Sequence, residues 1–325
     1  MLINAAIARF LADLEIGRSP ATVRTYGVAL RRLLEYRDDR APTIQDVADL
    51  AIELPLDFTR QLAREKVPRS TIETYTTAVS RFYAYLVREE IRPDLQLEAM
   101  QLRLAALRGR RHRALPRVPA DDVVERVLAA ARTIPLPTSR PADLARRRDI
   151  AIVETLRGSG VRVSELVSLR RGDLNHSTNG AIITGKGGKQ RLVLFTQAAW
   201  AAIDDYLVTR ADTAIGRGLA ALPVFSRHDR AARRPATLST NAVREIIWSL
   251  ATQAGLADSG LTPHRFRAWF ATHLVAETGD LAAVQDLLGH ESADTTRIYT
   301  KVAARRLRDI HSRAFGETVP HAESA

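Results

Sequence analysis

Residues 261–301 read LTPHRFRAWFATHLVAETGDLAAVQDLLGHESADTTRIYTK, and they place histidine, arginine and tyrosine side chains at spacings suited to binding a phosphate. Thr262 and Pro263 predict the start of a helix, because a threonine side chain can cap free backbone N–H groups and proline is tolerated in the first turn. His264 and Arg267 then share one face of that turn, where the helix dipole and the free N–H groups favour an anion. The stretch therefore predicts a phosphate-binding helix start.

A second helix is predicted downstream, over residues 280–288, where apolar residues recur at helical spacing. It should end at Gly289, a residue suited to a left-handed C-cap, which presents His290 at the helix exit. His273 points away from His264 and is interpreted as a core histidine. Taken singly, His290 could be a loop residue and Tyr299 a half-buried helix residue. Occurring together with the phosphate-binding turn, they favour a site.

The overall charge of the chain points to a polyanionic partner. Its 325 residues allow two domains with separate cores. Lys+Arg number 48 against 37 Asp+Glu, giving a net charge of +11, which favours binding to nucleic acid. The absence of cysteine excludes disulfides, thiolate zinc sites and cysteine nucleophiles. We find no cleavable leader and no membrane-length apolar run, so we expect a soluble cytoplasmic protein.

Lysine is rare in this chain, since nearly all positive charge is carried by arginine. The four lysines are Lys66, Lys186, Lys189 and Lys301. Two of them lie in GKGGKQR, between β-rich segments 181–184 and 190–195, and the Gly-Gly pair predicts a hairpin turn. Because lysine loses its proton more readily than arginine, Lys186 at this hairpin is a candidate proton donor.

The N-terminal part is predicted to be a helical domain spanning residues 1–107. Amphipathic patterns predict helices over 2–16, from Ser19-Pro20 onward, over 46–65 with a break near Pro55, and over 70–89. Residues 108–119 contain prolines and a run of arginines without acidic residues, which predicts a basic linker that contacts DNA nonspecifically. An ordinary solvated connector is the alternative. A second domain should span 120–316, followed by a disordered tail over 317–325.

Within the second domain, RGSGVRVSEL (157–166) predicts a helix end, a tight glycine turn and a new short helix. Arg162 lies just before that short helix, and Glu165 is three residues further on. A carboxylate at this spacing can orient the guanidinium, and a held arginine is a better phosphate ligand than a free one. Glu165 is therefore expected to hold the Arg162 guanidinium in position through its carboxylate.

These residues could together perform a transesterification on DNA. Arg162 and Arg267 would balance charge on the non-bridging phosphate oxygens, with His290 as a further donor. Tyr299 would be the nucleophile, activated by nearby cations, and Lys186 would protonate the departing deoxyribose oxygen. A phosphotyrosine link preserves the energy of the phosphodiester, so strands would be rejoined without ATP, metal or any other cofactor.

The ordered set Arg162, Lys186, His264, Arg267, His290 and Tyr299 resembles the six-residue signature of tyrosine recombinases, the phage integrase family, and the local sequence is similar to Xer-type enzymes. The resemblance covers about residues 118–305, and more weakly the N-terminal helices. It implies a mainly α protein of two domains: an N-terminal four-helix (SAM-like) core-binding domain and a C-terminal α+β catalytic domain with a small antiparallel sheet or hairpin. It also implies a clamp on duplex DNA, 3′-phosphotyrosyl intermediates, a four-subunit synapse and a C-terminal helix donated to a neighbouring subunit. Ala268 departs from the family, since relatives often have histidine there.

Other functions remain open from the sequence alone. A type IB topoisomerase uses similar residues, and a DNA-binding regulator could keep the fold without activity. A histidine metallo-nuclease is disfavoured, because the histidines lack ligand spacing and carboxylate partners. The partners expected are a duplex DNA recombination site and a further recombinase subunit, identical or related, and we expect no membrane partner. The candidate DNA-binding residues are Arg24, Arg108, Arg110, Arg111, Arg113 and Lys189.

Overall fold

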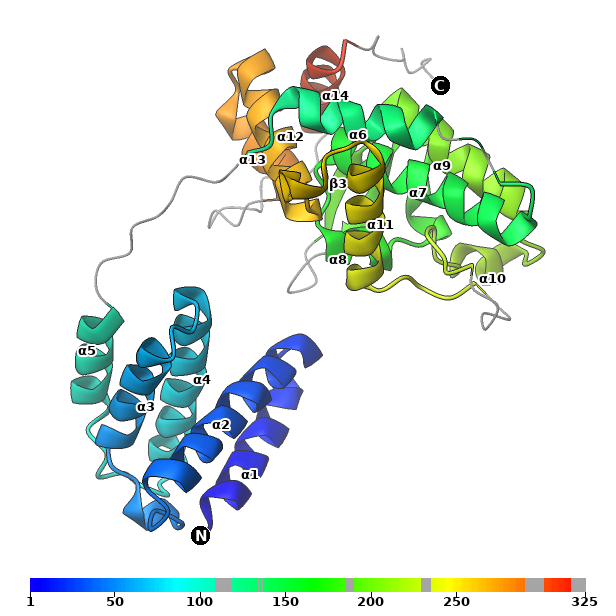
Figure 1. The fold of residues 1–325 in the computed structure, drawn as a ribbon. Helices are drawn as coiled ribbons and strands as arrows, with labels where there is room; N and C mark the ends of the chain where they lie inside the picture. Colours follow the sequence, from blue (N-terminus) through cyan, green and yellow to red (C-terminus); the bar gives the residue numbers. More distant parts are fainter. Residues whose placement is uncertain are drawn as a thin grey trace. The chain divides into compact units, whose positions relative to one another are not determined.

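The computed structural model describes residues 1–108, 118–133, 135, 137–184, 190–228, 235–289 and 301–316. The chain divides into two compact units, residues 1–114 and 115–325 (Figure 1). No helix in these described ranges is both long and apolar enough to cross a membrane.

The first unit is a bundle of helices (Figure 1). Its α-helices are α1 (Ile3–Gly17), α2 (Pro20–Arg40), α3 (Glu53–Arg64), α4 (Arg69–Arg88) and α5 (Leu97–Arg108), with a 3-10 helix at Val47–Asp49. Aromatic side chains hold its core together: the Phe10 ring centroid lies 5.7 Å from that of Phe82 and 5.3 Å from that of Tyr85. The apolar stripes of the amphipathic helices are therefore the surfaces that meet in the bundle.

Local signals placed most of these helices correctly. Ser19 caps α2, because its Oγ accepts a hydrogen bond from the Thr22 N–H at 3.2 Å, and Pro20 occupies the first turn. Pro55, however, lies inside the first turn of α3 and does not break it, since a proline there removes no intrahelical hydrogen bond. The fifth helix, α5, was not predicted and joins the four expected ones.

The second unit combines helices with one small sheet. Its α-helices are α6 (Asp121–Thr133), α7 (Arg140–Ser159), α8 (Val163–Ser168), α9 (Gln197–Arg210), α10 (Gly216–Ala220), α11 (Thr240–Gln253), α12 (Pro263–Thr278), α13 (Leu281–Leu288) and α14 (Lys301–Ala314). Short 3-10 helices lie at Arg171–Asp173, His176–Thr178 and Ala257–Ser259. The mainly α, two-domain fold class with a small antiparallel sheet is thus confirmed.

Three short strands form this antiparallel sheet. They are β1 (Leu174–Asn175), β2 (Gly180–Thr184) and β3 (Gln190–Leu194), in the order β1-β2-β3. Ile182 pairs with Leu192 in the β2–β3 register. The predicted strands are therefore paired, while the turn between them, residues 185–189, lies outside the described residues.

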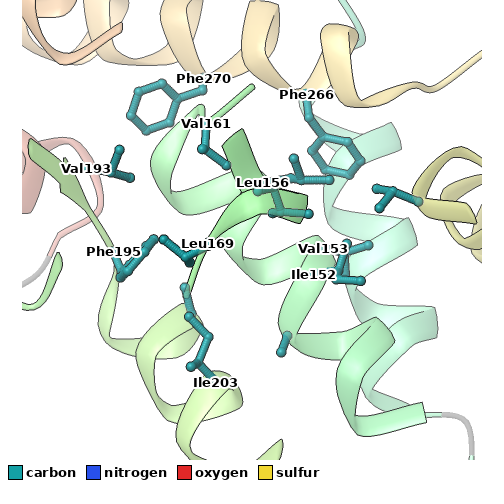
Figure 2. Close-up of a cluster of buried hydrophobic side chains, with 14 of the residues drawn as sticks. Ile152, Val153, Leu156, Val161, Leu169, Val193, Phe195, Ile203, Phe266 and Phe270 are labelled. Carbon is teal, nitrogen blue, oxygen red and sulfur yellow. The ribbon is translucent and has the colours of Figure 1, made fainter. Parts of the chain in front are cut away.

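The core of the second unit is built around α7 (Figure 2). Helix α12 contributes two buried phenylalanines, Phe266 and Phe270, β3 contributes Val193, and Phe195 follows directly after β3. Burying each phenylalanine side chain stabilises the fold by about 2 to 3 kcal/mol. The start of α12, which carries Arg267, and the turn after α7, which precedes Arg162, are thus fixed against each other by packing.

Helix α14 packs against α12 of its own chain. His311 on α14 is buried, and its Nε2 donates a hydrogen bond to the Gly158 carbonyl at 2.6 Å. The Phe315 ring lies 5.1 Å from the His311 ring and 6.0 Å from that of Phe270. Donation of this helix to a neighbouring subunit therefore stays a prediction, while its docking surface is defined by these contacts.

Candidate active site

The site begins at the glycine turn that ends α7. Gly160 adopts the left-handed conformation, with φ of 58°, and a Cβ at this position would collide with the Phe270 ring. Only glycine accepts this backbone and this close approach without strain. The turn places Arg162 immediately before α8 and directs the Gly160 carbonyl toward α12, where it accepts a hydrogen bond from Arg267 Nη1 at 2.6 Å.

Arg162 is held by Glu165, at the spacing noted in the sequence. The Glu165 Oε1 accepts from Arg162 Nη1 at 2.8 Å, and Oε2 accepts from the Arg162 backbone N–H at 2.8 Å. The carboxylate side chain is 7 % exposed, whereas the Arg162 side chain is 44 % exposed. Arg162 Nη2 also donates to the Gly289 carbonyl at 3.2 Å, so the guanidinium is fixed to the protein at both terminal nitrogens while the side chain stays partly accessible to an anion.

Arg267 lies deeper, on the first turns of α12. Its two terminal nitrogens donate to the Gly160 and Leu288 carbonyls, joining the end of α7 to the end of α13. Burial and, after it, the charges of Arg162 and Arg191 together lower the pKa of the Arg267 guanidinium to about 10, while the charge of Glu165 opposes the shift. A buried cation crowded by other cations is stabilised when an anion binds beside it.

Arg191 is a member of this cluster that the sequence analysis missed. It lies on β3, its side chain is 10 % exposed, and its Nη2 donates to Glu165 Oε2 at 2.8 Å. Its Nη1 donates to the Leu287 carbonyl at 2.6 Å. The available signal was strand alternation, because Arg191 and Val193 occupy the same inward-facing register of β3.

The cluster has more positive than negative charge. Burial would raise the pKa of the Glu165 carboxyl, but the charge of Arg191 and the hydrogen bonds from Arg191 and Arg162 hold that pKa below its ordinary value. Glu165 is therefore ionised at neutral pH, and one carboxylate faces the guanidinium groups of Arg162, Arg191 and Arg267. The excess of two positive charges suits a phosphate.

The predicted site residues fall into three groups. Arg162, Glu165 and Arg267 are brought together, and His264 is exposed one turn before Arg267 on α12. Thr262 caps α12 as expected, since its Oγ1 accepts from the Arg265 N–H at 3.3 Å. The residues that lie outside the described ranges are Lys186, Lys189, His290, Tyr299, Arg110, Arg111 and Arg113.

The remaining predictions lie away from this cluster. Arg24 is exposed on α2, and Arg108 ends α5, in the first unit. His273 stacks on Trp269 with ring centroids 4.7 Å apart, and its Nε2 lies 3.0 Å from the Ala314 carbonyl oxygen. It packs beneath α14 and does not join the arginines.

Two family models match this chain. The phage integrase family model matches residues 119–306, and the model for the phage integrase N-terminal SAM-like domain matches residues 7–90. The first match contains the whole arginine cluster, and the second falls within the helical bundle.

Curated relatives match over nearly the full length. Tyrosine recombinase XerC of Mycobacterium sp. (strain JLS) is 34 % identical over 310 residues, covering 95 % of this chain and 97 % of the relative. Tyrosine recombinase XerD of Halalkalibacterium halodurans is 30 % identical over 315 residues, covering 95 % of this chain and 97 % of the relative.

Solved structures share the fold. The XerH site-specific recombinase bound to difH substrate, a pre-cleavage complex, superposes with a TM-score of 0.67 at 19 % identity, covering 95 % of this chain and 94 % of that one. The XerH post-cleavage complex with a palindromic difH substrate gives 0.65 at 20 % identity, covering 89 % and 79 %. With the arginine cluster and the full-length relatives, these matches establish that the chain belongs to the phage integrase family, as a tyrosine recombinase similar to the Xer proteins.

Proposed function

We propose that this protein is a site-specific DNA recombinase that breaks and rejoins duplex DNA through a 3′-phosphotyrosyl intermediate. The observation that carries the proposal is the arrangement of Arg162 and Arg267 around the glycine turn at Gly160. One guanidinium is partly exposed and braced by Glu165, and the other is buried and short of negative charge. Such preorganised cations stabilise the charge that develops on phosphate oxygens during transfer.

In the proposed reaction, the arginines bind the non-bridging oxygens of the scissile phosphate. The Tyr299 hydroxyl gives up its proton to solvent as its oxygen attacks phosphorus, and the bond from phosphorus to the 5′ oxygen breaks. Lys186 gives that departing oxygen a proton, while His264 and His290 donate hydrogen bonds to the phosphate. Rejoining is the reverse: a 5′ hydroxyl attacks the phosphotyrosine and returns its proton to Lys186, and the departing Tyr299 oxygen regains a proton from solvent.

The charge on the transferred phosphate is balanced here by guanidinium groups, so the proposed mechanism uses no metal ion, cofactor or ATP. The proposed substrate is a duplex DNA recombination site, in keeping with the DNA-bound relatives. We further propose that four subunits, identical or from a related recombinase, assemble on the DNA in the cytoplasm. In that assembly α14 would dock on a neighbouring subunit.

The test is covalent capture on a nicked suicide substrate, from which the cleaved fragment diffuses away and prevents rejoining. We expect a DNA-linked protein whose labelled peptide contains Tyr299, with the DNA attached through its 3′ phosphate. Tyr299→Phe should form no covalent complex while still binding the DNA.

Two outcomes would contradict the proposal. Absence of any covalent complex with wild type, together with unimpaired biological function of Tyr299→Phe, would indicate a DNA-binding regulator that does not cleave strands. Relaxation of a supercoiled plasmid lacking any recombination site, by the monomer, would instead indicate a topoisomerase.

A further inference from the structure

One guanidinium, that of Arg191, connects three segments that are far apart in the sequence. The residue itself is on β3, next to the loop that carries Lys186. It donates to Glu165 on α8, 26 residues away, and to the Leu287 carbonyl on α13, 96 residues away. These two bonds use both terminal nitrogens of the side chain.

The end of α13 is shaped around the Arg191 side chain. Gly289 ends this helix in the left-handed conformation, with φ of 61°. A Cβ on Gly289 would collide with Cδ and Nε of Arg191, so the aliphatic stem packs directly on the glycine backbone. The backbone at the end of α13 is therefore held in place by the contact between Arg191 and Gly289.

Arg191 differs from Arg162 in what it can bind. Both donate to the Glu165 carboxylate, but the Arg191 side chain is 10 % exposed and the Arg162 side chain is 44 % exposed. The terminal nitrogens of both side chains donate to protein groups, since Arg162 Nη2 donates to the Gly289 carbonyl at 3.2 Å, so the two arginines differ in exposure and not in having partners. Arg191 is therefore less accessible to a phosphate than Arg162 is, and its contacts place it to hold Glu165 and the end of α13.

We infer that Arg191 is a positioning residue of the recombinase site: through Glu165 it fixes the orientation of Arg162, and through Leu287 it fixes the exit of α13. The inference rests on the proposed function, because Arg162 and the α13 exit matter to catalysis only if a phosphate is bound there. Replacing a residue that holds a ligand-binding side chain in position commonly lowers activity by about 10- to 100-fold.

Lysine cannot substitute for this residue. A guanidinium is a rigid fork with donors in two directions, whereas an ammonium is a single flexible point charge. Arg191→Lys keeps the charge and loses one of the two connections. Arg146→Lys is a matched control, because Arg146 is also buried in this unit and donates to two carbonyls, those of Ala130 and Ala131, away from the cluster.

The experiment measures single-turnover formation of the covalent complex on two suicide substrates. One carries the ordinary scissile phosphate, and the other carries a methylphosphonate, which is neutral and needs less cationic stabilisation. On the ordinary substrate we expect Arg191→Lys to be slower than wild type by about 10- to 100-fold. On the methylphosphonate the deficit should shrink to within about threefold, as it should for Arg162→Ala, because the interaction lost is charge stabilisation of the phosphate.

A loss of folded protein would slow both substrates equally, so an equal deficit on the two would overturn the inference. Full activity of Arg191→Lys would also overturn it. We expect Arg146→Lys to keep the wild-type preference between the two substrates.

A second pair of variants keeps the test valid if Arg191→Lys folds poorly. Arg191→Met, Glu165→Gln and their combination form a double-mutant cycle. If Arg191 acts through Glu165, the double variant should be no slower than the slower single one. Losses that multiply would contradict that route.

A readout without DNA separates this inference from the proposed function. In a crystal structure of Arg191→Lys, the Arg162 guanidinium and the turn over residues 287–289 should both be displaced from their positions in a wild-type crystal structure. If both are unchanged, the positioning role is wrong, whatever the protein does to DNA. If wild type forms no covalent complex while the displacement is seen, the proposed function fails and the positioning role stands.

Discussion

The docking of α14 should weaken as the pH falls, because a histidine is buried beneath it. His311 is fully enclosed and donates from Nε2 to the Gly158 carbonyl, so the ring is neutral when the helix is docked. Burial lowers the pKa of the His311 imidazole to about 4, although the hydrogen bond to Gly158 opposes the shift. An undocked helix exposes the ring, whose pKa then returns to about 6.5.

The sign and size of the effect follow from this difference. Protons bind more tightly to the undocked helix, so the stability of docking is complete above about pH 6.5 and is lost progressively down to about pH 4. Each tenfold change in the docking equilibrium constant corresponds to about 1.4 kcal/mol. The free energy of docking should therefore weaken by about 2 kcal/mol at pH 5 and by about 3 kcal/mol below pH 4. At pH 5 the undocked population should therefore rise by about 30-fold.

Hydrogen exchange of the α14 amides provides the assay. The protection factor of the amides over residues 307–314 is compared at pH 7.5 and pH 5, each corrected for intrinsic exchange. His311→Gln retains a donor for the Gly158 carbonyl but does not titrate, so its protection should be nearly independent of pH. His273, whose Nε2 lies 3.0 Å from the Ala314 carbonyl oxygen, is the second histidine at this helix, and His273→Gln controls for it.

The reasoning is refuted if His311→Gln loses protection with falling pH as steeply as wild type does. It is also refuted if the pH dependence disappears in His273→Gln alone. Either result would assign the titration to a group other than the buried His311 imidazole.

Three further outcomes are expected. Lys186→Ala should be rescued on a substrate whose 5′ leaving oxygen is replaced by sulfur, which needs little protonation, and rescue of Lys189→Ala in its place would move the role to that lysine. Gly160→Ala should lower the free energy of unfolding of the second unit by about 2 to 4 kcal/mol in urea, because it adds backbone strain and a steric clash. Gly279→Ala is the control: its φ is 66° but the space around it is open, so it should lower that free energy by only about 1 kcal/mol. Arg24→Ala should weaken DNA binding about equally for all sequences and reduce the slope of log affinity against log salt by about 1, while an unchanged slope would remove Arg24 from the DNA contact.

The sequence by itself determined the features that depend on neighbouring residues. Helix starts at Ser19 and Thr262 and the helix end at Gly289 were predicted correctly, because capping and left-handed turns act within a few residues. The pairing of Arg162 with Glu165 also follows from a three-residue spacing. Helix α5 was missed, because its packing on the rest of the bundle stabilises it and its own sequence pattern is weak.

Only the tertiary structure decided which distant side chains meet. Arg191 is an unremarkable strand residue until β3, α8 and α13 converge on it across 26 and 96 residues. His311 becomes a buried donor only because α14 packs onto the end of α7, 153 residues earlier in the chain. Periodicity and capping report which face of an element is apolar, whereas burial, and the hydrogen bonds and pKa shifts that come with it, depends on what that face is packed against.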